Sequence, residues 1–119
     1  MGSRLLIVED NNALRQMLSW DLEDLGYAVS STSSCAGARD LLCSGHFDAA
    51  VLDYNLPDGD GVQLSRELSQ RFPCIKIIIC SGAAHGQPAQ FFTDAGARQF
   101  VSKPVSAERL HQLLNPSVP

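Results

Sequence analysis

The chain has 119 residues, which is enough for one domain with a buried core and too few for two. Its 45% hydrophobic and 18% charged residues exclude an intrinsically disordered chain, and its formal net charge of −4 argues against general binding to nucleic-acid phosphates. No apolar run approaches the ~20 residues that span a bilayer, so we expect no membrane segment and a single domain over residues 1–119.

The first half of the chain alternates apolar runs with amphipathic segments. Residues 5–8 form a continuous apolar run, which is typical of a strand covered on both faces. A helix is predicted to begin at Asn11 or Asn12 and to end at Gly26. Its apolar face is predicted to consist of Leu14, Met17, Leu18, Leu22 and Leu25. Residues 27–32 predict a more polar edge strand, and Ser34 is the expected cap of a second helix that ends at Gly45.

The second half repeats this alternation three more times. An apolar run ends at Asp53, where Pro57, Gly59 and Gly61 are expected to break any regular structure before a third helix. Residues 75–80 form the clearest buried strand. Further patterns predict a helix over residues 88–96, a strand over residues 99–102 and a last helix over residues 107–114.

Five strands that alternate with five helices predict an α/β fold with parallel strands and helices on both faces of the sheet. For five such units the flavodoxin-like (βα)5 order 2-1-3-4-5 is the natural doubly wound solution. That order places strands 1 and 3 side by side and so brings Asp10 close to Asp53. Ser81 and Lys103 follow strands 4 and 5 and are expected at the same edge.

The cysteines indicate the redox compartment. The chain has four cysteines, which are Cys35, Cys43, Cys74 and Cys80. They show neither C-x-x-C spacing nor a pairing with histidine that is typical of a zinc site. No signal-peptide pattern precedes the first strand. We therefore expect reduced thiols and a cytoplasmic protein.

Five polar residues follow the predicted strand ends, namely Glu9, Asp10, Asp53, Ser81 and Lys103. Each one alone is explained by a turn, a helix start or a solvated surface, but their convergence favours a functional site. Three clustered carboxylates repel one another and favour a divalent cation with hard oxygen ligands, hence Mg²⁺. An aspartate carboxylate can attack phosphorus, so the cluster predicts reversible phosphorylation of Asp53, with Lys103 and Ser81 neutralising phosphoryl oxygens.

The motifs that carry these residues resemble the receiver domain of bacterial two-component response regulators. They are the runs at residues 6–10 and 52–57, with residues 60–61, Ser81-Gly82 and Lys103-Pro104, and the resemblance spans residues 4–114. It implies a signalling phosphoacceptor rather than an enzyme, which assists its own Mg²⁺-dependent phosphorylation and dephosphorylation. The implied donor is a phosphohistidine on a sensor histidine kinase or a histidine phosphotransfer protein.

The resemblance also implies a role for each site residue. Asp10 and Asp53 would bind Mg²⁺ through carboxylates, Asn55 through its backbone carbonyl, and Glu9 through a water molecule. Lys103 would contact a phosphoryl oxygen and precede a cis bond to Pro104. Ser81 and Phe100 occupy the switch positions, while Asn55 and Ala83 occupy positions that tune the lifetime of the phosphate.

The output of such a switch is expected on one face. It would comprise the fourth helix, the fifth strand and the fifth helix, around residues 87–92 and 105–112, and it would bind a downstream partner or output domain. The sequence leaves open a receiver-like interaction module that is not phosphorylated. A phosphatase of the haloacid dehalogenase type would need a second aspartate where Asn55 stands, and flavin binding lacks a phosphate loop. The sequence also leaves open whether the domain acts alone or within a larger regulator or hybrid kinase.

Overall fold

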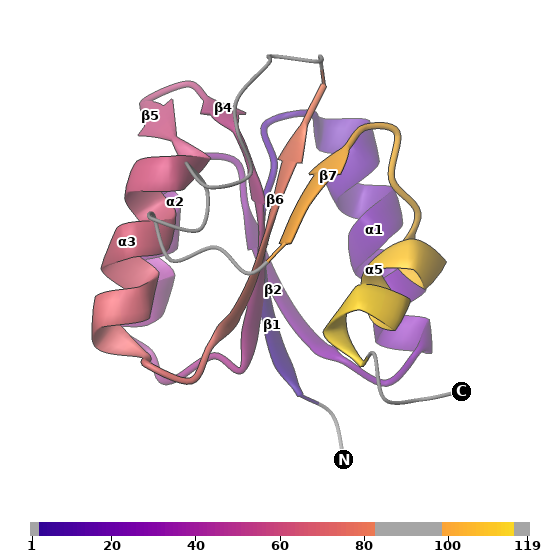
Figure 1. Cartoon of the computed structure of the whole chain (residues 1–119), viewed down its shortest axis with the longest axis horizontal. Helices are drawn as coiled ribbons and strands as arrows, with labels where there is room; N and C mark the ends of the chain where they lie inside the picture. Colours follow the sequence, from indigo (N-terminus) through magenta and orange to yellow (C-terminus); the bar gives the residue numbers. More distant parts are fainter. Residues whose placement is uncertain (1–2, 83–98, 116–119) are drawn as a thin grey trace.

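A computed structural model describes residues 3–82 and 99–115 of the chain and shows a parallel five-stranded sheet between two layers of helices (Figure 1). The strands are β1 (Arg4–Val8), β2 (Ala28–Thr32), β3 (Ala49–Asp53), β6 (Lys76–Ser81) and β7 (Gln99–Ser102). Their order in the sheet is β2-β1-β3-β6-β7, and every pair is parallel. The predicted doubly wound, flavodoxin-like fold is therefore confirmed, including the placement of β1 beside β3.

Two described helices cover each face of the sheet. Helices α1 (Asn12–Asp24) and α5 (Ala107–Leu114) lie on one side, and α2 (Cys35–Leu42) and α3 (Gly61–Arg71) lie on the other (Figure 1). The helix predicted over residues 88–96 lies outside the described residues. Among the described helices, none is long and apolar enough to cross a membrane.

Side-chain caps define where the described helices begin. Asn11 accepts a hydrogen bond from the backbone N–H of Leu14, and Ser34 accepts one from Gly37, as the sequence predicted. Asp60 caps α3 and Ser106 caps α5 in the same way. Each cap satisfies an N–H group that has no partner within the helix, so the local sequence fixes these boundaries.

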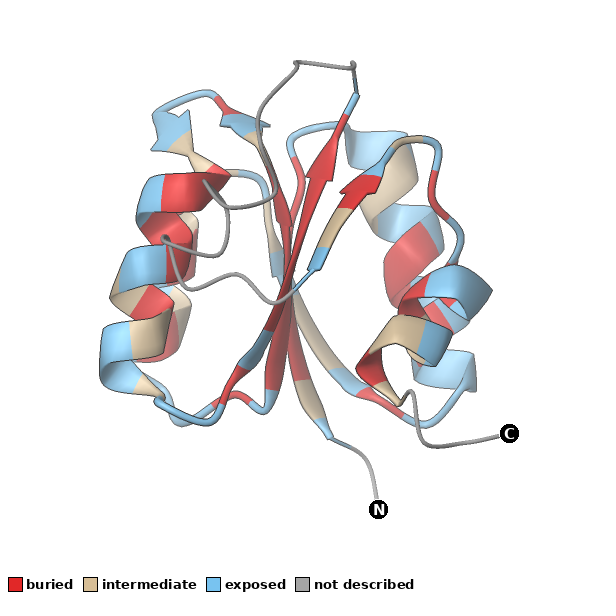
Figure 2. Cartoon of the chain, viewed as in Figure 1, coloured by how far each residue is buried: buried red, intermediate tan, exposed pale blue. Residues whose placement is uncertain are grey.

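The core consists of two apolar layers that share the central strands (Figure 2). Alternate residues of β1, β3 and β6 enter opposite layers: Leu6 packs on the α2–α3 side and Leu5 on the α1–α5 side. All five residues of β3 are buried, because helices cover both faces of this strand. The carboxyl ends of the central strands are thus supported from both sides of the sheet.

The structure corrects three details of the sequence-based prediction. Met17 and Leu25, placed on the inner face of α1, are exposed, and so is Trp20 between them. The helix packs through a narrow strip at four-residue steps, which leaves positions on its flank in solvent. Helix α2 ends three residues before Gly45.

The third correction concerns the segment after β3, where no regular structure was expected. Strands β4 (Asn55–Leu56) and β5 (Gly59–Asp60) form a two-residue antiparallel hairpin. The N–H of Gly61 donates a hydrogen bond of 2.9 Å to the carbonyl of Tyr54 and closes the hairpin at its base. Glycine and proline residues therefore shape a tight turn here instead of ending all pairing.

An ion pair joins the two helices on one face. The guanidinium of Arg39 in α2 donates hydrogen bonds of 2.9 and 2.7 Å to the two carboxylate oxygens of Glu67 in α3. These hydrogen bonds lower the pKa of Glu67, and burial opposes the effect. A group whose folded-state pKa is lowered stabilises the fold above its unfolded pKa, and the contribution is lost as pH falls through the folded pKa.

We expect the substitution Glu67→Gln to lower the free energy of unfolding by about 0.5 kcal/mol at neutral pH, because the pair is exposed to solvent. The difference from the wild type should shrink as pH falls below about 4, where the carboxylate of Glu67 becomes protonated. Urea denaturation at several pH values measures both effects. A difference that is constant with pH would show that packing, not charge, links the two helices.

Candidate functional site

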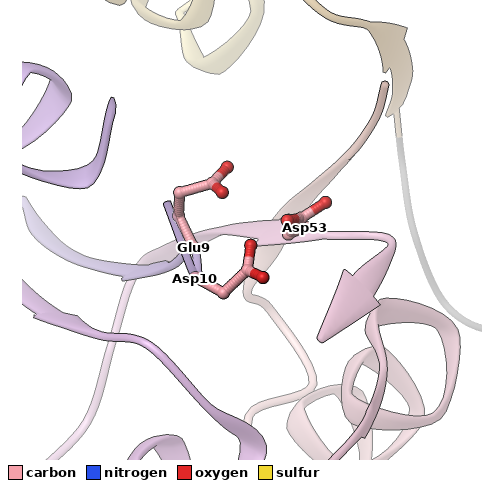
Figure 3. A group of neighbouring side chains, drawn as sticks. All are labelled: Glu9, Asp10 and Asp53. Carbon is pink, nitrogen blue, oxygen red and sulfur yellow. The ribbon is translucent and has the colours of Figure 1, made fainter. Parts of the chain in front are cut away.

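The carboxyl ends of β1 and β3 bring three acidic side chains together (Figure 3). Glu9 and Asp10 directly follow β1, and Asp53 is the last residue of β3. One carboxylate oxygen of each residue lies within 4.8 Å of the others. Glu9 and Asp53 are buried, whereas Asp10 is exposed at the rim. This edge of the sheet thus concentrates negative charge in a partly desolvated site.

Lys103 places a positive charge against this cluster. Its Nζ lies 2.8 Å from Oε1 of Glu9 and 3.3 Å from Oδ2 of Asp53. Its backbone N–H donates a hydrogen bond of 2.7 Å to the carbonyl of Ser81, so the end of β6 positions the lysine. The peptide bond between Lys103 and Pro104 is cis.

The loop between β1 and α1 is held by a residue that sequence reasoning missed. Arg15 donates hydrogen bonds from Nη1 to the carbonyl of Glu9, at 2.8 Å, and from Nη2 to Oδ1 of Asn12, at 2.7 Å. The carboxylate of Glu9 in turn accepts the N–H of Asn11, at 3.0 Å. The helical periodicity gave no reason to single out Arg15, since its role depends on the side chain reaching back from the first turn of α1 to the loop before it.

The segment after Asp53 is fixed by backbone contacts. The N–H of Tyr54 donates a hydrogen bond of 2.8 Å to the carbonyl of Cys80 in β6. Gly61, the first residue of α3, packs so closely that a Cβ atom there would lie 2.5 Å from the backbone oxygen of Asp53. A glycine at this position therefore allows α3 to begin directly against the acidic strand end.

The electrostatics of the site favour an added cation. Burial raises the pKa of Asp53 to about 6, with the charge of Glu9 adding to the rise and Lys103 opposing it. Burial lowers the pKa of Lys103, but its contacts with Glu9 and Asp53 outweigh that effect and raise the pKa above its usual value. Three carboxylates facing one ammonium leave excess negative charge, and their hard oxygen atoms suit Mg²⁺ or Ca²⁺.

The other sequence-predicted residues lie around this edge. Ser81, the last residue of β6, is fully buried. Phe100 in β7 is half-buried and packs against the core on the α2–α3 side. Asn55 is exposed, and its N–H lies 3.4 Å from Oδ1 of Asp53. Ala83 lies outside the described residues.

Fold and site together define a flavodoxin-like domain with a cluster of three acidic side chains at the carboxyl edge of its sheet. A family model described as the response regulator receiver domain matches residues 5–115. The chain belongs to this family.

Two curated relatives are longer than this chain. The transcriptional regulatory protein GltR of Pseudomonas aeruginosa is 32% identical over 92% of this chain and 46% of its own length. The sensor protein TorS of Escherichia coli is 33% identical over 95% of this chain and 12% of its own length. The chain thus spans less than half the length of either relative.

Two solved structures share the fold closely. A CheY-like response regulator receiver domain protein from Methanospirillum hungatei has a TM-score of 0.89 and 27% identity, covering 98% of this chain and 94% of that one. A response regulator protein from Burkholderia pseudomallei has a TM-score of 0.88 and 26% identity, covering 95% of this chain and 66% of that one. The latter structure contains a phosphorylated aspartic acid, a calcium ion and citrate.

Proposed function

We propose that this chain is the phosphoacceptor of a two-component phosphorelay, in which Asp53 takes a phosphoryl group from a phosphohistidine. The observation that carries the proposal is the convergence of Asp53, two further carboxylates and Lys103 at one strand edge. The donor would be a sensor histidine kinase or a histidine phosphotransfer protein. Labelling of Asp53 by acetyl phosphate in the presence of Mg²⁺ tests the proposal directly.

The donor set fits Mg²⁺, which would neutralise charge on the transferred phosphoryl group. Asp10 and Asp53 would bind the ion through carboxylates, and Asn55 would bind it through its backbone carbonyl. Glu9 would hold a water molecule of the ion's shell. Clustered carboxylates and the raised pKa of Asp53 support this assignment, because a nearby cation favours the ionised form that acts as nucleophile.

In the transfer step, a carboxylate oxygen of Asp53 forms a bond to phosphorus as the bond from phosphorus to the histidine nitrogen breaks. The electron pair of the broken bond returns to the imidazole. Lys103, which contacts Asp53 at 3.3 Å before the reaction, would pair with a phosphoryl oxygen afterwards. Attack of water on phosphorus would break its bond to the Asp53 oxygen, release inorganic phosphate and regenerate the carboxylate, with Asn55 and Ala83 setting how long the phosphoryl group survives.

The phosphoryl oxygens would accept new charge-assisted hydrogen bonds from Ser81 and Lys103. The resulting shift of these residues would pass the signal through Ser81 and Phe100. The output face would include β7 and α5, where a groove is lined by Phe100, Val105 and Arg109 among other residues. Its remaining part, around residues 87–92, lies outside the described residues.

Beryllofluoride with Mg²⁺ should mimic the phosphorylated state and shift the amide NMR signals of Phe100 and of residues 105–112. The reason is that Lys103, which contacts Asp53 and directly follows β7, would change its partner on phosphorylation. Comparison of amide spectra with and without beryllofluoride provides the measurement. Shifts confined to the loops around Asp53 would contradict an output face at β7 and α5.

The phosphoryl donor is expected to use the exposed flank of α1. Helix α1 starts next to the acidic site, and Trp20, 61% exposed, lies beside exposed Met17. Neighbouring exposed large apolar side chains are typical of protein-binding surfaces. The donor needs such a surface because it must hold its histidine at the site.

The substitution Trp20→Ala should therefore slow phosphotransfer from a protein donor about tenfold or more and leave labelling by acetyl phosphate unchanged. Its stability should stay within about 0.5 kcal/mol of the wild type, since the side chain is exposed. Radiolabel transfer from a phosphorylated donor, run beside acetyl phosphate, measures the two rates. Equal slowing with both donors would place the effect in the site and not in docking.

We propose that the domain works in the cytoplasm. All four cysteines are free, and Cys43 and Cys74 are exposed. Exposed unpaired thiols are typical of a reducing compartment.

A further inference from the structure

One side chain of the β4–β5 hairpin forms hydrogen bonds with the start of helix α2. Asp58 lies at the tip of the hairpin, between Leu56 and Gly59. Its Oδ1 accepts the N–H of Cys35 at 2.8 Å, and its Oδ2 accepts the N–H of Ala36 at 2.9 Å. Both donors belong to the first turn of α2, where backbone N–H groups have no partner within the helix. One carboxylate therefore bridges two segments that are more than twenty residues apart in sequence.

The surrounding packing shows that the hairpin and the helix are fitted to each other. A Cβ atom at Gly59 would lie 3.0 Å from Sγ of Cys35, which is buried. Leu56 is buried in the same core layer as Cys35. Glycine at position 59 thus allows the hairpin to approach Cys35 more closely than a larger residue would. Asp58 adds hydrogen bonds to the same contact between the hairpin and α2.

The base of the hairpin is attached to the functional site. Tyr54 bonds to the carbonyl of Cys80 in β6, and Gly61 bonds to the carbonyl of Tyr54. Asn55 is the first residue of β4 and is paired with Asp60. The hairpin is therefore held to β6 and α3 at its base and to α2 at its tip, and Asn55 lies between these attachments.

We propose that Asp58 is a positioning residue for the cation site. By fixing the tip of the hairpin to α2, it fixes the backbone carbonyl of Asn55 relative to the carboxylate of Asp53. The inference rests on the proposed function, which assigns that carbonyl to the Mg²⁺ shell. Groups that orient metal ligands commonly change metal affinity tenfold or more when removed, without touching the ion themselves. Without the hydrogen bonds from α2 to Asp58, the hairpin pivots about its base and the backbone carbonyl of Asn55 loses its fixed position.

The test titrates the wild-type chain and three variants with Mg²⁺. The amide NMR signals of residues 53–56 report binding at each Mg²⁺ concentration. Asp58→Ala removes both contacts with α2. Asp58→Asn keeps one acceptor oxygen and should give an intermediate result. Ser34→Ala is the matched control, because it removes a hydrogen bond to Gly37 in the same helical turn without altering the hairpin.

We expect Asp58→Ala to bind Mg²⁺ about tenfold more weakly and Ser34→Ala to bind it within about twofold of the wild type, although both lower the Tm. Equal Mg²⁺ affinities for the two variants would overturn the positioning role and leave Asp58 as a helix cap alone. If the wild type binds no Mg²⁺, the proposed function fails separately. The spectra recorded without metal then test whether Asp58 positions Asn55. Asp58→Ala should shift the amide signal of Asn55, and Ser34→Ala should not. An Asn55 signal that Asp58→Ala leaves unmoved would also overturn the inference.

Discussion

Asp53→Asn should keep its unmodified mass in acetyl phosphate and Mg²⁺, under conditions in which the wild-type chain gains one phosphoryl group. The amide oxygen of asparagine is a far weaker nucleophile than a carboxylate, so labelling should fall below detection. The variant should remain folded. Burial and the charge of Glu9 raise the pKa of Asp53 to about 6, which means that its ionised form opposes folding at neutral pH. Intact-protein mass spectrometry measures the label.

The surface substitution Asp40→Asn is the matched control, because Asp40 is an exposed aspartate on α2 away from the acidic cluster. It should label like the wild type. Label that persists on Asp53→Asn would contradict the assignment of the acceptor. A wild-type chain that takes no label would favour a receiver-like module that only binds partners, and turnover of generic phosphomonoesters would favour a phosphatase.

Gly61→Ala should lower the free energy of unfolding by about 2 kcal/mol, as expected for overpacking of a well-packed interior. The added Cβ would lie 2.5 Å from the backbone oxygen of Asp53, and neither that strand end nor the start of α3 can move freely. Because the strand end carries Asp53, the proposed acceptor, labelling by acetyl phosphate should also slow. Thermal and urea unfolding measure the first effect, and the initial labelling rate measures the second.

Gly82→Ala is the control for this substitution. Among the described residues, a Cβ at Gly82 would meet only Cδ of Lys103, at 3.9 Å, which is an ordinary contact. Its stability should therefore stay close to that of the wild type. Equal losses in both variants would indicate a general requirement for glycine near the site and would contradict a specific clash at Gly61.

The sequence predicted the sheet order and the convergence of the acids for a simple physical reason. Strands buried on both faces read as continuous apolar runs, and their ends are marked by polar residues such as Asp10 and Asp53. Parallel strands joined by helices all end at the same edge, so the topology alone brings these residues together. The helix caps at Asn11 and Ser34 were equally predictable, since they depend on contacts within three residues.

What the sequence did not reveal depends on long-range or crowded contacts. Asp58 resembled an ordinary turn residue, because its partners lie in α2, whose position follows only from the folded sheet. The exposure of Met17 reflects how narrowly α1 contacts the core, which helical periodicity does not determine. The roles proposed for Ser81, Phe100 and Asn55 remain predictions that the experiments above address.

The burial of the central strands on both faces determines how substitutions in the core should affect labelling. The acids and the lysine follow strand ends held between two apolar layers, so their relative placement is established once, when the chain folds. A large-to-small substitution in these layers, away from the strand ends, should therefore lower the fraction of folded chains without changing the labelling rate of the chains that are folded. Across a series of core variants, labelling should then follow the fraction of chains that are folded.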